Sequence, residues 1–118
     1  MNKSIISVDK DDTIRLAVKK MIQGDLGSVI VTDNNKPVGM LTERDILRYI
    51  YHEKINLNDT AQTIMTNPLI SVDINATIDE AAQIMLTNNI RRLLVKEKDE
   101  YVGIISQREL QKSVSELS

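Results

Sequence analysis

Two patterns of apolar residues alternate along this chain. Short apolar runs between polar segments predict strands, and apolar residues three and four positions apart predict amphipathic helices. In chain order, the patterns predict a strand at 5–8, a helix after Thr13, strands at 28–32 and 37–41 joined by a tight turn, and a helix from Thr42. Residues 52–58 form a predicted polar connector, and a short helical segment follows at 60–65.

The same order of elements then returns: a strand at 69–72, a helix at 77–87, strands at 92–95 and 101–105, and a helix from Ser106. Each half is therefore predicted to be a β-α-β-β-α unit. Gly24 is predicted to end the first helix in the left-handed conformation. The predicted inward-facing stripes of the helices are Ile14, Ala17, Val18, Met21 and Ile22; Ile46, Leu47 and Ile50; and Ile78, Ala81, Ala82, Met85 and Leu86.

Individual residues repeat as well. The octapeptide from Val38 to Asp45 (VGMLTERD) returns from Val102 to Glu109 (VGIISQRE), at a constant offset of 64 residues. The chain is thus an internal duplication. We expect a first repeat at 1–54, a linker with a short helix at 55–66 and a second repeat at 67–118. Because each half alone has a marginal core, the halves are expected to fold as one compact body.

Composition narrows the classes of function. The 118 residues carry a net charge of −2 with both signs interspersed, which argues against nucleic-acid binding. Cysteine is absent and His52 is the only histidine, so no metal site is expected. No apolar run has the length of a membrane span, and the N-terminus lacks a signal-peptide core. We therefore expect a cytoplasmic protein, and the lack of a catalytic constellation predicts that it is not an enzyme.

Thr42-x-x-Asp45 and Ser106-x-x-Glu109 each place an acid three positions after a hydroxyl residue, and we call them hydroxyl–acid motifs. They have two interpretations. One is the helix capping box, which Thr42–Asp45 fits less well because aspartate is shorter than the preferred glutamate or glutamine. The other is a ligand site. The start of a helix attracts phosphate, and a carboxylate one turn further along can accept hydrogen bonds from both hydroxyls of a ribose. The similar run at 77–80 is assigned only a capping role.

The duplicated unit, its Gly-x-x-Thr/Ser-x-x-acid motifs and the Met65-Thr66-x-x-Leu69 run resemble a pair of cystathionine-β-synthase (CBS) domains, also called a Bateman module. The resemblance extends from Ser4 to about Leu117. It implies an α/β fold in which two repeats pack about a pseudo-twofold axis into one compact module. It also implies that the hydroxyl–acid motif binds the ribose and phosphate of an adenosine nucleotide in the cleft between the repeats.

Carried over residue by residue, the resemblance implies two sites. In the first, Met40, Leu69 and Leu93 would flank an adenine, and Arg91 and Arg92 would meet phosphates, the alternative for the arginines being a solvated strand end. The first site comprises Met40, Thr42, Asp45, Thr66, Asn67, Pro68, Leu69, Ile70, Arg91, Arg92 and Leu93. The second site is expected to be weaker, because it lacks the aspartate and the arginines. It comprises Lys3, Ser4, Ile6, Gly27, Ser28, Ile104, Ser106 and Glu109.

The resemblance thus implies a stand-alone regulatory module that senses AMP, ADP or ATP, with S-adenosylmethionine or NAD as weaker candidates, and that needs no cofactor. Its output would pass to a separate effector protein. CBS pairs commonly form homodimers through their helices, and the helix at 43–51, with Tyr49, Ile50 and Tyr51 near its end, is compatible with a partner surface. The alternative is a protein–protein interaction module with degenerate ligand sites, which the glutamate at position 109 favours.

Overall fold

The computed structural model describes residues 1, 3, 5–52, 56–67 and 69–117. The chain divides into two compact units. The first-repeat unit comprises residues 6–69, and the second-repeat unit comprises residues 1–5 together with 70–118.

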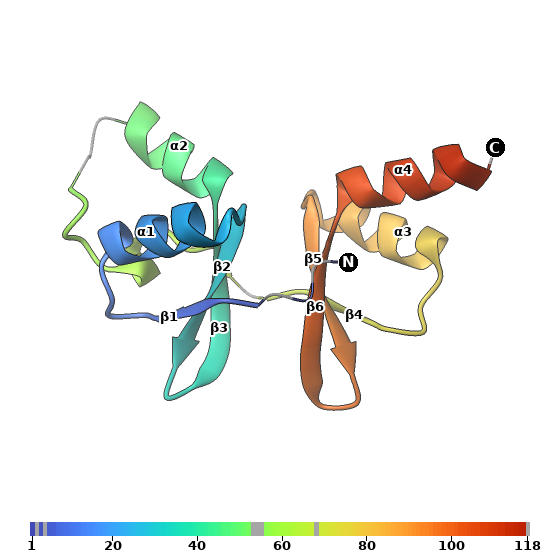
Figure 1. Ribbon diagram of the computed structural model, residues 1–118, viewed down its shortest axis with the longest axis horizontal. Helices are drawn as coiled ribbons and strands as arrows, with labels where there is room; N and C mark the ends of the chain where they lie inside the picture. The colour runs from blue at the N-terminus through green and yellow to red at the C-terminus, as the bar shows by residue number, and fades with distance from the viewer. Residues whose placement is uncertain (2, 4, 53–55, 68, 118) are drawn as a thin grey trace. The chain divides into compact units, whose positions relative to one another are not determined.

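The first-repeat unit is a three-stranded sheet with two helices on one face (Figure 1). The sheet has the order β1-β2-β3, with β1 parallel and β3 antiparallel to β2. The elements are β1 (Ser7–Asp9), α1 (Ile14–Gly24), β2 (Ser28–Asp33), β3 (Lys36–Thr42), α2 (Glu43–Tyr51) and the 3₁₀ helix η1 (Ala61–Thr63).

The second-repeat unit repeats this design, again with both helices on one face of the sheet (Figure 1). Strand β4 is parallel and β6 antiparallel to the central β5. The elements are β4 (Ser71–Asp73), α3 (Ile78–Asn88), β5 (Arg92–Glu97), β6 (Glu100–Ser106) and α4 (Gln107–Leu117). The predicted β-α-β-β-α order is confirmed in both repeats.

Each unit has its own hydrophobic core between its sheet and its helices. Because side chains alternate along a strand, Val29 and Val31 of β2 face the helices in one unit, and Leu93 and Val95 of β5 do so in the other. The first core contains Val8, Ala17, Met21, Val29, Val31, Leu41 and Ala61; the second contains Val72, Ala81, Met85, Leu93, Val95 and Leu110.

The predicted inward stripes of α1 and α3 are too wide. Ile22 is 74% exposed, and Leu86, its counterpart in the second repeat, is 72% exposed. A three-stranded sheet covers a narrow strip of each helix, so residues such as Ala17 and Met21 are buried while the position after Met21 turns to solvent.

The end of α1 also differs from the prediction. Gly24 is the last helical residue, and the left-handed position is taken by Asp25, with φ 51°. The Leu26 N–H donates to the Met21 carbonyl at 2.8 Å and the Asp25 N–H to the Ile22 carbonyl at 3.2 Å, which is the hydrogen-bond pattern of a Schellman cap.

Helix α2 buries a different face from the one predicted. Ile46 packs against the core, but Leu47 and Ile50 are exposed, whereas Asp45 and Tyr49 are buried. Two polar side chains explain this difference. The Tyr49 hydroxyl donates to an acceptor in the segment after α2, and the Asp45 carboxylate is held at the start of the helix, so these two side chains orient α2.

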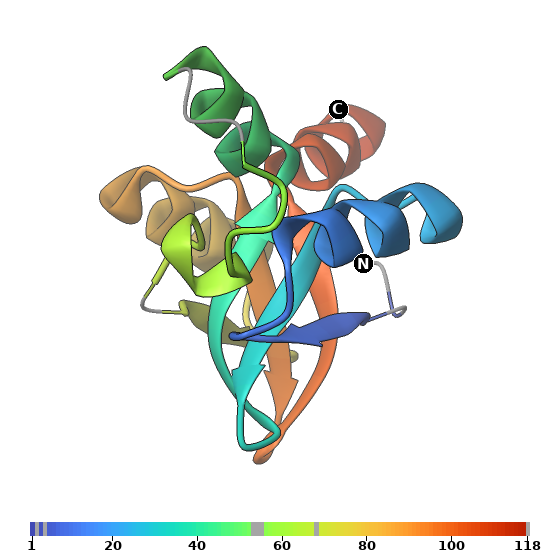
Figure 2. The same ribbon diagram turned by 90° about the vertical axis from the view of Figure 1, so that its left-hand side faces the viewer.

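The segment after α2 belongs to the first-repeat unit. Figure 2 shows its described part, from residue 56 on, running across the helix-bearing face of the sheet to η1. The Ile14 N–H donates to the Asp59 carbonyl at 2.8 Å, and the Ala61 N–H donates to the Asp12 carbonyl at 2.7 Å. Ala61 is fully buried in the core. Within the described ranges, no helix combines the length and the apolar character needed to cross a membrane.

Candidate functional site

The first hydroxyl–acid motif lies where β3 ends and α2 begins. Thr42 is the N-cap of α2, in an extended conformation. Oδ2 of Asp45 accepts hydrogen bonds from the Thr42 N–H at 2.8 Å and from the Thr42 hydroxyl at 2.9 Å, and Thr42 Oγ1 accepts from the Asp45 N–H at 3.3 Å. This is a complete capping box, so the prediction that aspartate fits the box less well was wrong. The carboxylate reaches the N-cap residue without the extra methylene of glutamate.

Asp45 is also bonded from a distant part of the chain. The hydroxyl of Thr66, in the segment after η1, donates to Oδ1 of Asp45 at 2.9 Å. Asp45 is only 7% exposed, so these hydrogen bonds compensate for the loss of water around its charge. The structure thus brings together Thr42, Asp45 and Thr66, three of the residues that the resemblance implies for the first site. Their role in binding a ligand stays a prediction.

Thr66 is placed by its backbone. Its N–H donates to the Met40 carbonyl at 2.8 Å, and its carbonyl accepts from the Met40 N–H at 2.9 Å. Gly39 permits this approach, because a Cβ there would lie 2.5 Å from Met65 Sδ and 3.0 Å from the Thr66 carbonyl oxygen. A methyl group at this position would displace Met65 and crowd the Thr66 carbonyl oxygen, so glycine favours the close packing here.

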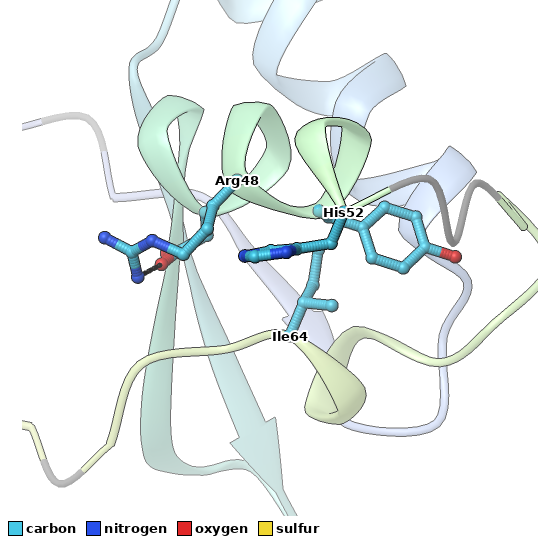
Figure 3. Close-up of a pocket in the computed structure, with 5 residues that line it drawn as sticks. Arg48, His52 and Ile64 are labelled. Carbon is cyan, nitrogen blue, oxygen red and sulfur yellow. Dashed lines mark ion pairs between the residues drawn. The ribbon is translucent and has the colours of Figure 1, made fainter.

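A pocket of about 240 Å³ opens beside Asp45, between α2 and the segment that follows it (Figure 3). Asp45, Arg48, Tyr49, His52 and Ile64 line it. The Arg48 guanidinium, on a side chain that is 60% exposed, lies 3.9 Å from Oδ1 of Asp45. Arg48 and Ile64 were not among the site residues predicted from the sequence. The spacing of Arg48 from Asp45 could have identified it, because side chains three positions apart lie on the same face of a helix.

Tyr49 lines this pocket and is fixed by its hydroxyl group. Its hydroxyl lies 2.9 Å from the Asn56 carbonyl and 3.1 Å from Oδ2 of Asp59, and it accepts from the Asn56 N–H at 2.6 Å. Tyr49 was expected at a partner surface, but it is buried. That expectation was wrong for Tyr49, because its hydroxyl anchors the segment after α2.

In the second hydroxyl–acid motif the serine and the glutamate are likewise hydrogen-bonded to each other. The Ser106 hydroxyl donates to Oε1 of Glu109 at 3.3 Å, and the Glu109 N–H donates to the Ser106 hydroxyl at 3.2 Å. Oε2 of Glu109 lies 2.6 Å from the α-amino group of Met1. Glu109 therefore has a cationic partner at its second oxygen.

The loops before the central strands hold the helix starts in the same way in both repeats. The Gly27 carbonyl accepts from the Glu43 N–H at 3.1 Å, and the Arg91 carbonyl accepts from the Gln107 N–H at 2.8 Å. Ser28 is buried. Arg91 is exposed and Arg92 is half-buried, and neither forms an ion pair with a described residue.

The remaining predicted site residues are distributed over both units. Met40, Asn67 and Leu69 belong to the first-repeat unit, and Leu93 is fully buried in the core of the second. Ser4 and Pro68 lie outside the described residues. Lys3, Ile6 and Asn67 are exposed, Leu69 and Ile70 are half-buried, and Met40 and Ile104 are buried.

The joint action of residues from the two repeats stays a prediction. For metals, the described part of the chain contains no group of three histidine, aspartate or glutamate side chains placed to hold an ion.

Comparison with known proteins identifies one family. The family model described as CBS domain matches residues 1–52 and again residues 61–116. An uncharacterized protein of Methanocaldococcus jannaschii is 30% identical over 99% of the chain, and one of Methanopyrus kandleri is 29% identical over 92%. The chain spans 31% and 57% of the lengths of these two relatives.

Solved structures agree with this match. A putative signal-transduction protein with CBS domains from Burkholderia ambifaria is 29% identical, with a TM-score of 0.86 over 96% of this chain and 84% of that one. A CBS domain protein from Pyrobaculum aerophilum, solved as a complex with AMP, is 29% identical, with a TM-score of 0.83 over 99% of this chain and 93% of that one.

Proposed function

The chain belongs to the CBS-domain family as a tandem pair of CBS repeats, and we propose that it is a regulatory module that binds an adenosine nucleotide. The observation that carries this proposal is the Asp45 carboxylate. It is buried at the start of α2, it lines a pocket, and its three neutral donors come from Thr42 and Thr66. The AMP complex of the relative from Pyrobaculum aerophilum supports an adenosine compound as the ligand class.

The chemistry at Asp45 suits a ribose. A carboxylate accepts hydrogen bonds from two vicinal hydroxyls, and Oδ1 borders the pocket where Arg48 lies. The positive end of the α2 dipole lies beside it and attracts a phosphate group. We include Arg91 and Arg92 in this proposal as donors to the phosphates, because guanidinium groups pair with phosphate oxygens in a planar fork.

We propose a binding role and no catalytic one. Around the pocket, the Tyr49 hydroxyl is held by Asn56 and Asp59, and the Asp45 carboxylate is held by hydroxyl groups. The described groups therefore orient a ligand and pair with its charges. A nucleotide that binds one conformation better than another shifts the population between them, which is how the module would signal to an effector protein.

Calorimetric titration of the purified protein with AMP, ADP, ATP, S-adenosylmethionine and NAD tests the proposal. Asp45→Asn keeps the shape of the side chain but replaces one acceptor oxygen by a donor, and we expect it to lose binding at least tenfold, given that a hydrogen bond to a charged group contributes about 1.5–3 kcal/mol. Glu109→Gln is the matched control, and we expect it to retain the tighter site. Saturable binding that survives Asp45→Asn unchanged would place the ligand elsewhere.

A protein–protein interaction module is the second candidate, and the outer face of α2 favours it. Leu47 is 66% exposed and Tyr51 is 81% exposed on this helix, with Ile50 beside them. An exposed apolar helix face suits a second copy of the chain or an effector protein. Absence of binding to all five ligands, together with self-association through α2, would favour this candidate.

A further inference from the structure

The acceptor capacity of Asp45 is almost fully used by the protein itself. A carboxylate offers roughly four acceptor positions, two on each oxygen. Oδ2 already accepts the N–H and the hydroxyl of Thr42, and Oδ1 accepts the hydroxyl of Thr66. The Arg48 guanidinium is 3.9 Å from Oδ1, beyond hydrogen-bond distance. One acceptor position therefore stays open, whereas a ribose diol needs two.

The three donors on Asp45 differ in how easily they can leave. The Thr42 N–H is fixed by the end of β3, and the Thr42 hydroxyl also accepts from the Asp45 N–H, so both are held within the capping box. The Thr66 hydroxyl, by contrast, donates to Asp45 from an exposed residue whose backbone is bonded independently to Met40. Rotation of the Thr66 side chain about its Cα–Cβ bond releases the acceptor without disturbing either backbone pairing.

We infer that the Thr66 hydroxyl occupies the position on Asp45 that the second hydroxyl of a ribose takes, and that it is exchanged for that hydroxyl when a nucleotide binds. This inference rests on the proposed function and adds to it a residue that competes with the ligand. Thr66 thereby sets the affinity for diols, because each binding event breaks one hydrogen bond inside the protein before the second ribose hydroxyl is accepted.

Because of where Thr66 lies in the chain, the exchange also affects the segment that connects the two repeats. It lies three residues before Leu69, the last residue of the first-repeat unit. Releasing its hydroxyl from Asp45 removes a side-chain tether from the segment that leads into the second-repeat unit. The same step that admits the ribose therefore loosens the connection between the repeats, which supplies a differential interaction of the kind that ligand signalling requires.

The test compares AMP with 2′-deoxy-AMP by calorimetry on four proteins. Thr66→Val removes the hydroxyl and keeps the branched shape, Thr66→Ser keeps a hydroxyl, and Thr63→Val is a control that removes an exposed hydroxyl bonded to Thr60 instead of Asp45. We expect Thr66→Val to bind AMP roughly threefold to tenfold more tightly than the wild type, the range that one net hydrogen bond provides. The affinity for 2′-deoxy-AMP should stay unchanged, because a single hydroxyl fits the open acceptor position. Thr66→Ser and Thr63→Val should resemble the wild type.

Each other outcome is decisive. AMP binding that is unchanged or weaker in Thr66→Val overturns the exchange while leaving the proposed function in place. Equal gains for AMP and 2′-deoxy-AMP also overturn it, because Thr66 then only positions Asp45. If neither the wild type nor Thr66→Val binds AMP, 2′-deoxy-AMP or any of the other four ligands titrated above, the proposed function fails and the exchange fails with it. Unfolding temperatures of all four proteins, measured in parallel, show that each is folded.

Discussion

Asp25 and Asn89 are counterparts in the two repeats, and both are in the left-handed conformation, with φ values of 51° and 52°. Each follows the first helix of its repeat and closes it through two backbone hydrogen bonds. Neither residue is glycine, although this conformation costs a residue with a Cβ about 1–2 kcal/mol and costs glycine little. The short polar side chains of aspartate and asparagine reduce that cost.

This relationship predicts that Asp25→Gly and Asn89→Gly stabilise the protein. We expect each to raise the free energy of unfolding by about 0.5–1 kcal/mol, since glycine removes the Cβ strain but adds chain entropy to the unfolded state. Chemical denaturation measures the change. Gln23→Gly, at an exposed helical position of α1, is the control and should destabilise by about 1 kcal/mol. A loss of stability in both cap variants would contradict the prediction.

The capping box predicts that Asp45→Ala is costly for folding as well as for binding. The change removes the acceptor of three hydrogen bonds and leaves the Thr66 hydroxyl without its partner on Asp45. We expect a loss of about 2–4 kcal/mol in the free energy of unfolding. Asp79→Ala, at an exposed position in the first turn of α3, should cost only a few tenths to about 1 kcal/mol. Equal losses for the two variants would mean that Asp45 acts only through the helix dipole.

The close approach at Gly39 predicts that Gly39→Ala destabilises the protein by about 1–3 kcal/mol, because the new methyl group meets the Thr66 carbonyl oxygen and Met65. Thermal unfolding measures this effect. Gly24→Ala is the control, because its Cβ meets only the flexible Leu26 side chain at 3.0 Å and alanine favours a helical position. If Gly39→Ala is as stable as the wild type, the 65–66 segment moves away without cost.

Because the Tyr49 hydroxyl is hydrogen-bonded, Tyr49→Phe and Tyr51→Phe are expected to differ in their free energies of unfolding. Tyr49→Phe removes the hydroxyl bonded to Asn56 and Asp59, and we expect it to reduce the free energy of unfolding by about 1–3 kcal/mol. Tyr51→Phe, at a position that is 81% exposed, should leave stability unchanged. Indistinguishable denaturation curves for Tyr49→Phe and the wild type would refute this anchoring role.

The outer face of α2 predicts the oligomeric state. If the chain forms a homodimer through this face, Leu47→Glu should convert it to a monomer in sedimentation-velocity experiments, because burying a carboxylate in an apolar interface is unfavourable. Ile22→Glu is the matched control on α1, where an apolar side chain is similarly exposed (74% against 66% for Leu47), and should leave the dimer intact. Dissociation by Ile22→Glu alone would assign the interface to α1.

Much of the fold could be predicted because its signals are local and occur twice. Helices were predicted to begin after Thr13, at Thr42 and at Thr77, and each of these threonines accepts a hydrogen bond from a backbone N–H one turn later. The tight turn predicted between the strands that became β2 and β3 contains Asn34 and Asn35, which both have positive φ, as hairpin turns require. Caps and turns depend on the side chains and backbone conformations of a few neighbouring residues, so they can be predicted directly from the sequence.

The tertiary contacts of individual side chains could not be predicted from the sequence. Ile22 and Leu47 fit an apolar stripe as well as their buried neighbours do, and only the width of the sheet and the anchoring of Tyr49 turn them to solvent. The motif of Thr42 and Asp45 could be read as a helix cap or as a ligand site.

The tertiary structure shows that the cap is complete and that Thr66, twenty-one residues from Asp45, also bonds the carboxylate. Repeats, caps and turns were therefore determined by the sequence itself, because they are local. The hydrogen-bonding state of Asp45 was decided by the fold, because its second oxygen is satisfied by a residue that only chain folding brings near.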